Sequence, residues 1–96
     1  MDFEKIYREV GEWSVETFPE SGPEIHVKKL KHEAEEVLED LNDIVEYADC
    51  LICIFASAYK ASIDPKKLLK AVEEKLEVCK TRTWVLQEDG THQHVE

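Results

Sequence analysis

Apolar residues recur every three or four positions along most of the chain, and this spacing restricts the fold more than any other feature of the sequence. Helices are predicted over four ranges: 3–18, 23–41, 44–61 and 65–84. Short polar or Pro- and Gly-containing connections separate them, and no segment alternates with the period of a strand. The pattern predicts an all-α four-helix bundle, a single domain over residues 1–96, with an irregular tail at 85–96.

The third predicted helix is apolar nearly all round between Cys50 and Tyr59, which indicates burial on several sides. A chain of 96 residues buries a smaller share of its apolar surface than a longer chain does. We therefore expect self-association to complete the bundle.

The charge balance restricts the partners. Twenty-two acidic residues face twelve Lys and Arg, and the net charge of −10 repels nucleic-acid backbones, so we expect no binding to DNA or RNA. The charged first ten residues and the short apolar runs predict neither a signal peptide nor a membrane helix. Three cysteines, an odd number, fit a reducing compartment, and we expect a cytoplasmic protein.

The stretch from Glu33 to Asp49 contains eight acidic residues and no Lys or Arg. Within it, Glu33 with Glu36 and Glu46 with Asp49 are spaced three apart, which places each pair on one helix face. In an antiparallel hairpin the two pairs would differ in height by roughly 3 Å. Such oxygen ligands favour Mg²⁺ or Mn²⁺, whereas the alternative is an ordinary solvated face. Glu36 lies at a large angle from the centre of the apolar face of its helix, so a second helix or subunit would have to close over it.

Other kinds of functional site fit the sequence less well than a Mg²⁺ or Mn²⁺ site does. A di-iron bundle needs Glu-x-x-His pairs, which the helices lack, and no Gly-rich loop follows a strand. Cys50 and Cys53 lie mid-helix without a second ligand pair, which predicts core packing. His26 and His32 flank the acidic stripe, where a surface role is expected, although His26 could also contact phosphate.

These motifs resemble the MazG-like superfamily of all-α nucleoside triphosphate pyrophosphohydrolases over most of the chain. The resemblance rests on five segments: Glu12–Trp13 with Thr17–Phe18, Leu30–Glu36, Glu46–Ile52, Lys75–Leu76 and Arg82–Trp84. It implies that Mg²⁺, with Mn²⁺ as a possible substitute, is held by Glu33, Glu36, Glu46 and Asp49. It further implies cleavage between the α and β phosphates, giving a nucleoside monophosphate and pyrophosphate, with Glu33 or Glu36 as the catalytic carboxylate.

Candidate substrate-binding residues lie outside the acidic stretch. Lys75 and Arg82, seven apart on the last helix, could neutralise phosphate charge, and Lys29 lies one turn before Glu33; for Lys75 and Arg82 the alternative is a surface role. Trp13 could stack on a base, or it could pack in the core as part of the apolar stripe of its helix.

One residue departs from the family pattern, because Cys79 stands where similar proteins often carry Asn. The alternative to an enzyme is therefore a weak or inactive helical oligomerisation module of the same fold. The resemblance also implies a homodimer or homotetramer. It leaves the nucleotide open, with phosphoribosyl-ATP or a deoxypyrimidine triphosphate as other candidates.

Overall fold

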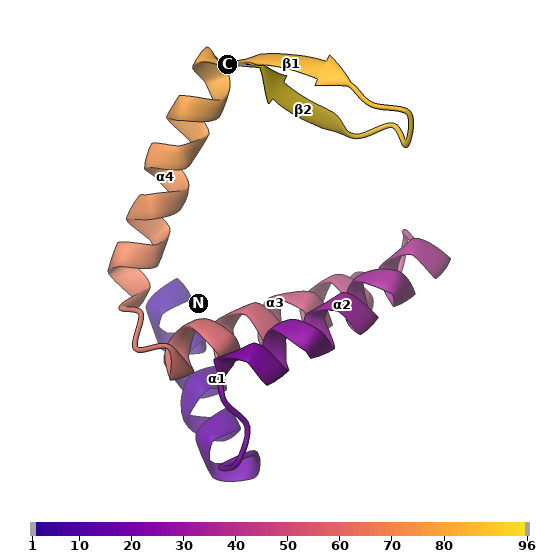
Figure 1. Cartoon of the computed structure of the whole chain (residues 1–96). Coiled ribbons are helices and arrows are strands. Elements are labelled where there is room, and N and C mark those ends of the chain that lie inside the picture. The colour runs from indigo at the N-terminus through magenta and orange to yellow at the C-terminus, as the bar shows by residue number, and fades with distance from the viewer. Residues whose placement is uncertain (1, 96) are drawn as a thin grey trace. The chain divides into compact units, whose positions relative to one another are not determined.

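The computed structural model describes residues 2–95 as four helices followed by a two-stranded hairpin (Figure 1). The elements are α1 (Phe3–Thr17), α2 (Pro23–Glu39), α3 (Ile44–Lys60), α4 (Pro65–Thr81), β1 (Thr83–Leu86) and β2 (His92–Val95). The helical prediction is confirmed. The chain divides into two compact units, one up to residue 66 and one from residue 67, and each is described by itself. The prediction of one domain stays a prediction.

Aspartate side chains fix the starts of three helices. Asp2 Oδ1 accepts a hydrogen bond from the Glu4 amide at 3.0 Å, and Asp43 Oδ1 accepts one from the Val45 amide at 3.0 Å. Asp64 Oδ2 accepts the Lys66 amide at 3.1 Å. Each bond satisfies an amide that has no partner inside the helix. The fourth start is set by Pro23, whose ring suits the first helical position.

In the first unit α3 contacts both α1 and α2, and the α2–α3 pair runs antiparallel through a tight connection (Figure 1). The α1–α3 contact is closest at Gly11, where an added Cβ would overlap the Tyr59 ring. Tyr7 is fully buried beside Phe55 and Tyr59, and its hydroxyl donates to the Ile63 carbonyl at 2.7 Å. The core of this unit therefore lies along one face of α1.

The apolar face predicted for α2 is only partly its buried face. Leu38 is 75% exposed and Val27 is also exposed, Leu30 and Val37 are half-buried, and the buried residues of α2 are His26 and Glu33. The prediction holds only in part because periodicity locates an apolar face but does not identify which neighbour covers it. Turning His26 and Glu33 toward α3 leaves much of the apolar face uncovered.

The face of α3 predicted to be buried on several sides is partly exposed in the single chain. Leu51, Ile52 and Ile54 are exposed, while Cys53 and Ala56 are buried. Self-association therefore stays a prediction. No helix formed by residues 2–95 is both long and apolar enough to cross a membrane.

The second unit corrects the prediction of an irregular tail at 85–96, because most of the described tail is in strands. β1 and β2 pair antiparallel, with Thr83 opposite Val95 and Leu86 opposite His92. The turn uses Gly90 at a φ of 91°, a left-handed conformation that glycine adopts readily. Each strand has only four residues and β2 reads His-Gln-His-Val, so the period-2 pattern is too short to detect. The same pairing ends α4 at Thr81 rather than near residue 84.

Candidate active site

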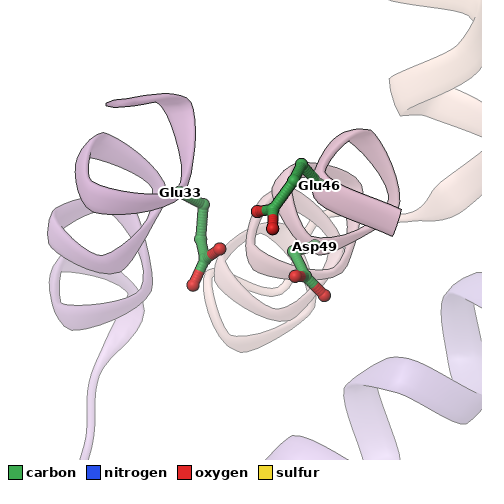
Figure 2. Close-up of side chains that lie close together, drawn as sticks. All are labelled: Glu33, Glu46 and Asp49. Atoms are coloured by element: carbon green, nitrogen blue, oxygen red, sulfur yellow. The ribbon is translucent and has the colours of Figure 1, made fainter. Parts of the chain in front are cut away.

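Three carboxylates converge between α2 and α3. Glu33 comes from α2, Glu46 and Asp49 come from α3, and one oxygen of each lies within 4.8 Å of the others. In Figure 2 the Glu33 side chain points across the gap toward Glu46 and Asp49. The spacing of three puts Glu46 and Asp49 on one face of α3, and the antiparallel turn brings them level with Glu33. Among residues 2–95 this is the only group of three or more side chains so placed that they could hold a metal ion.

The fourth predicted ligand, Glu36, lies outside this group of three but joins it through Glu46. Burial raises the pKa of the Glu46 carboxyl, and a hydrogen bond with the Glu36 carboxyl and the negative charges of Glu36, Asp43 and Asp49 raise it further. Carboxylates that approach this closely repel one another unless a proton or a cation lies between them. The cluster therefore favours the binding of positive charge.

Glu33 is the most enclosed member of the cluster, with 7% of its surface exposed. Lys29 Nζ lies 3.2 Å from Glu33 Oε1, and this hydrogen bond, with the charge of Glu33, raises the pKa of Lys29. Within the described chain, Glu33 Oε2 and Glu46 Oε2 are buried without a hydrogen-bond partner. Buried carboxylate oxygens are normally paired with a donor or a metal ion, and these two fit a hard divalent cation.

A cavity of about 450 Å³ adjoins the carboxylates, a size typical of small-molecule sites. Glu33, Asp49 and Lys29 line it together with the aromatic residues Trp13 and Phe18. The Trp13 and Phe18 rings meet edge to face, with centroids 5.4 Å apart. One cavity thus combines charged side chains suited to phosphate and metal with flat rings suited to a base.

The α1–α2 connection, which carries Phe18, is held by a lysine of α3. Lys60 Nζ donates hydrogen bonds to the carbonyl of Phe18 at 2.7 Å and to that of Ser21 at 2.8 Å. Ser57 Oγ, one turn earlier, donates to the Pro23 carbonyl at 2.9 Å. The third helix therefore supplies two carboxylates at one end and fixes a wall of the cavity at the other.

The predicted substrate-binding residues fall into two groups. Lys29 and Trp13 both line the cavity, and Trp13 is 50% exposed, so the alternative of core packing was wrong for this residue. Lys75 and Arg82 belong to the second unit, and their role in phosphate binding stays a prediction. Arg82 follows the end of α4, with Nη1 3.4 Å from His94 Nδ1, so the helix face predicted to be shared with Lys75 does not extend that far.

Phe18 and His26 also line the cavity. From the sequence, Phe18 was placed only at a helix end and in a segment of the family resemblance. The surface role predicted for His26 was wrong, because His26 is 8% exposed and lines the cavity, and its contact with phosphate stays a prediction. A signal for His26 was available: it precedes Glu33 by seven residues, which is two helical turns and the same face.

The cysteines match the packing role predicted for them. Cys53 is buried and Cys50 is half-buried on α3. Burial, followed by the charge of Glu33, raises the pKa of both thiols. The reactive form of cysteine is the thiolate, which this environment disfavours.

The sequence model of the dATP/dGTP pyrophosphohydrolase family matches residues 6–96. The chain belongs to this family. The Eaa protein of Salmonella phage P22 is 38% identical to it over 87 residues, covering 91% of the chain. The dATP/dGTP diphosphohydrolase of Salmonella phage PMBT28 is 34% identical over 91 residues, covering 94% of the chain. The chain spans only 27% and 30% of the lengths of these two relatives.

The fold of this dATP/dGTP pyrophosphohydrolase family member also matches a solved structure. The MazG-like pyrophosphohydrolase of cyanophage S-2L, solved with dGDP and three catalytic Mn²⁺ ions per active site, superposes with a TM-score of 0.82. The match covers 100% of this chain and 99% of that one at 24% sequence identity. The predicted MazG-like bundle fold is therefore confirmed.

Proposed function

We propose that this chain is a divalent-cation-dependent pyrophosphohydrolase that converts dATP and dGTP to the monophosphate and pyrophosphate. The observation that carries the proposal is that Glu33 and Asp49, two of the three clustered carboxylates, line the same cavity as Trp13 and Phe18. Membership of the dATP/dGTP pyrophosphohydrolase family supports it. The similar cyanophage protein, which binds dGDP and Mn²⁺, supports the same substrate class.

The residues proposed to hold Mg²⁺, or Mn²⁺ in its place, are Glu33, Glu46 and Asp49, with Glu36 beside Glu46 as the fourth carboxylate. Their fit to a cation rests on the two buried carboxylate oxygens that have no partner within residues 2–95. A bound divalent cation would supply positive charge that polarises the phosphoryl group. Lys29, paired with Glu33 and lining the cavity, would hold a phosphate oxygen beside the carboxylates.

In the proposed reaction, a water oxygen forms a bond to the α phosphorus while the bond from that phosphorus to the α–β bridging oxygen breaks. Pyrophosphate leaves with the bridging oxygen, and the proton of the water passes to a carboxylate, for which Glu33 and Glu36 are the candidates. Trp13 and Phe18 would bind the base and keep the α phosphate in place. Lys75 and Arg82 are proposed to neutralise phosphate charge.

We also propose that the enzyme is a cytoplasmic homodimer or homotetramer. Apolar side chains exposed on α3, among them Leu51 and Ile54, and on α4, among them Val72 and Leu76, support this. Large apolar side chains exposed on a helix face are often covered by a partner in soluble proteins. Light scattering coupled to size-exclusion chromatography measures the assembly directly.

The test of the proposed reaction is a panel of canonical and modified nucleoside triphosphates incubated with Mg²⁺ or Mn²⁺ in ¹⁸O-labelled water. The proposal requires pyrophosphate from dATP and dGTP, with the label in the monophosphate. Inorganic phosphate as the first product, label in the pyrophosphate, or no turnover of any nucleotide would each contradict it. Turnover abolished by Glu46→Ala in a protein of unchanged oligomeric state excludes the alternative of an inactive oligomerisation module.

A further inference from the structure

His26 lines the cavity, and it is a buried polar side chain with a ring nitrogen that has no partner among the described residues. The residue is 8% exposed and its Nε2 has no hydrogen-bond partner among the described residues. The imidazole meets the Phe18 ring edge to face, with centroids 6.0 Å apart. A buried nitrogen left unpaired is unfavourable, so a ligand that supplies its partner gains affinity.

The surroundings of His26 favour the neutral ring. Burial lowers the pKa of His26, the positive charge of Lys60 lowers it further, and only Glu24 acts in the opposite direction. A neutral imidazole carries one N–H donor and one acceptor, whereas the charged ring carries two donors. At neutral pH the side chain can therefore offer one N–H to an acceptor.

The position of His26 in the cavity indicates which part of a nucleotide it meets. The carboxylates, with Lys29, are suited to the phosphates, and Trp13 and Phe18 are suited to the base. His26 packs against Phe18 and is therefore placed at the base.

We propose that His26 is a specificity-determining residue that selects purine nucleotides by donating a hydrogen bond from Nε2 to the N7 atom of the base. This inference rests on the proposed function and adds the residue that reads the substrate. N7 is an acceptor on both adenine and guanine and has no counterpart on cytosine or thymine. A single donor to N7 would bind adenine and guanine without distinguishing them. This agrees with the description of the family, which names both dATP and dGTP.

The experiment compares dGTP with 7-deaza-dGTP, which carries C–H in place of N7, in wild-type protein and in three variants. His26→Phe removes the donor and keeps a ring, His26→Gln keeps an N–H donor, and His32→Phe changes an exposed histidine on the same helix as a control. We expect wild type and His32→Phe to lose about tenfold in kcat/KM on the 7-deaza substrate. His26→Phe should lose about tenfold on dGTP and treat the two substrates alike, and His26→Gln should keep part of the discrimination.

Calorimetric binding of dGDP and 7-deaza-dGDP in the presence of Mn²⁺ gives the same comparison without turnover. One outcome is that the wild type releases no pyrophosphate from either triphosphate and still binds dGDP more tightly than 7-deaza-dGDP in a way that depends on His26. That result would contradict the proposed reaction and support this inference. The inference would be overturned, and the proposed reaction left intact, if the wild type had the same kcat/KM for dGTP and 7-deaza-dGTP and the same affinity for dGDP and 7-deaza-dGDP. Discrimination that survives in His26→Phe, or binding of neither diphosphate, would also overturn it. Should His26→Phe fail to fold by circular dichroism, the wild-type and His26→Gln comparisons still decide the question.

Discussion

The two units of the chain carry the same helical pattern of apolar residues and differ in what becomes of it. Every buried side chain among residues 2–95 belongs to the first unit, including Tyr7, Ala56 and Glu33. In the second unit Leu69, Val72 and Leu76 recur at helical spacing along α4, yet all three are exposed. Periodicity is thus enough to form a helix, whereas burial also needs a neighbour. The carboxylate cluster lies in the unit where α2 and α3 provide one.

The first and largest predicted effect compares acidic residues of the two units by the activity lost when each is neutralised. Glu46→Gln and Asp49→Asn keep the shape of the side chain and remove the charge, and each should lower pyrophosphate release from dGTP by about a hundredfold or more. Glu73→Gln, an exposed acid on α4, is the matched control and should retain wild-type activity. Initial rates at saturating Mg²⁺ measure the effect. Equal losses in all three variants would show that general acidity, rather than the cluster, matters.

A second prediction compares packing in the two units. Gly11→Ala places a methyl group against the Tyr59 ring and should lower the free energy of unfolding by about 2 kcal/mol. Leu76→Ala on exposed α4 should change it by less than about 0.5 kcal/mol in the monomer. Urea denaturation followed by circular dichroism gives both values. If Leu76→Ala strongly lowered the free energy of unfolding at concentrations where the protein self-associates, a partner would be shown to cover α4. The difference in packing between the two units would then hold only for the isolated chain.

A third prediction concerns the lysine that holds the cavity wall. Lys60→Met removes the hydrogen bonds to Phe18 and Ser21 and should raise KM for dGTP about tenfold with kcat nearly unchanged. Lys60→Arg, which keeps the charge and the donors, should restore much of the affinity. Lys80→Met in the second unit removes only an exposed pair with Glu77 and serves as the control. A fall in kcat with unchanged KM would contradict this role.

The smallest expected effect is the pH dependence of stability contributed by His26. The pKa of His26 in the folded chain lies below 6.5, so the unfolded chain binds more protons between these two values. Its contribution to stability is complete above pH 6.5 and is lost as the pH falls through the lowered value. The urea midpoint of the wild type should therefore decline on acidification more than that of His26→Phe. Parallel curves for the wild type and His26→Phe would refute the prediction.

Much of the fold follows from local chemistry in the sequence. Capping by Asp2 and Asp43 and the placement of Pro23 fixed the helix starts to within a residue. The spacing of three in Glu46 and Asp49 and the short turn before them predicted the convergence with Glu33, because helix geometry and antiparallel pairing leave little freedom.

The remainder depends on tertiary contacts that a sequence pattern does not specify. The buried face of α2 includes the polar residues His26 and Glu33, which the apolar pattern of that helix does not contain. Phe18 lines the cavity, and its carbonyl accepts a hydrogen bond from Lys60, 42 residues later. The hairpin escaped notice because four-residue strands show too little alternation, and its pairing places Arg82 beside His94 rather than on α4.

The most direct test of the account is an anomalous-difference map from crystals of this protein grown with Mn²⁺ and dGDP. The account predicts manganese peaks within coordination distance of the Glu33, Glu46 and Asp49 carboxylates, with the nucleotide phosphates on the cavity side. A fully occupied nucleotide whose phosphates lie away from these carboxylates, or a map without manganese among them, would contradict it.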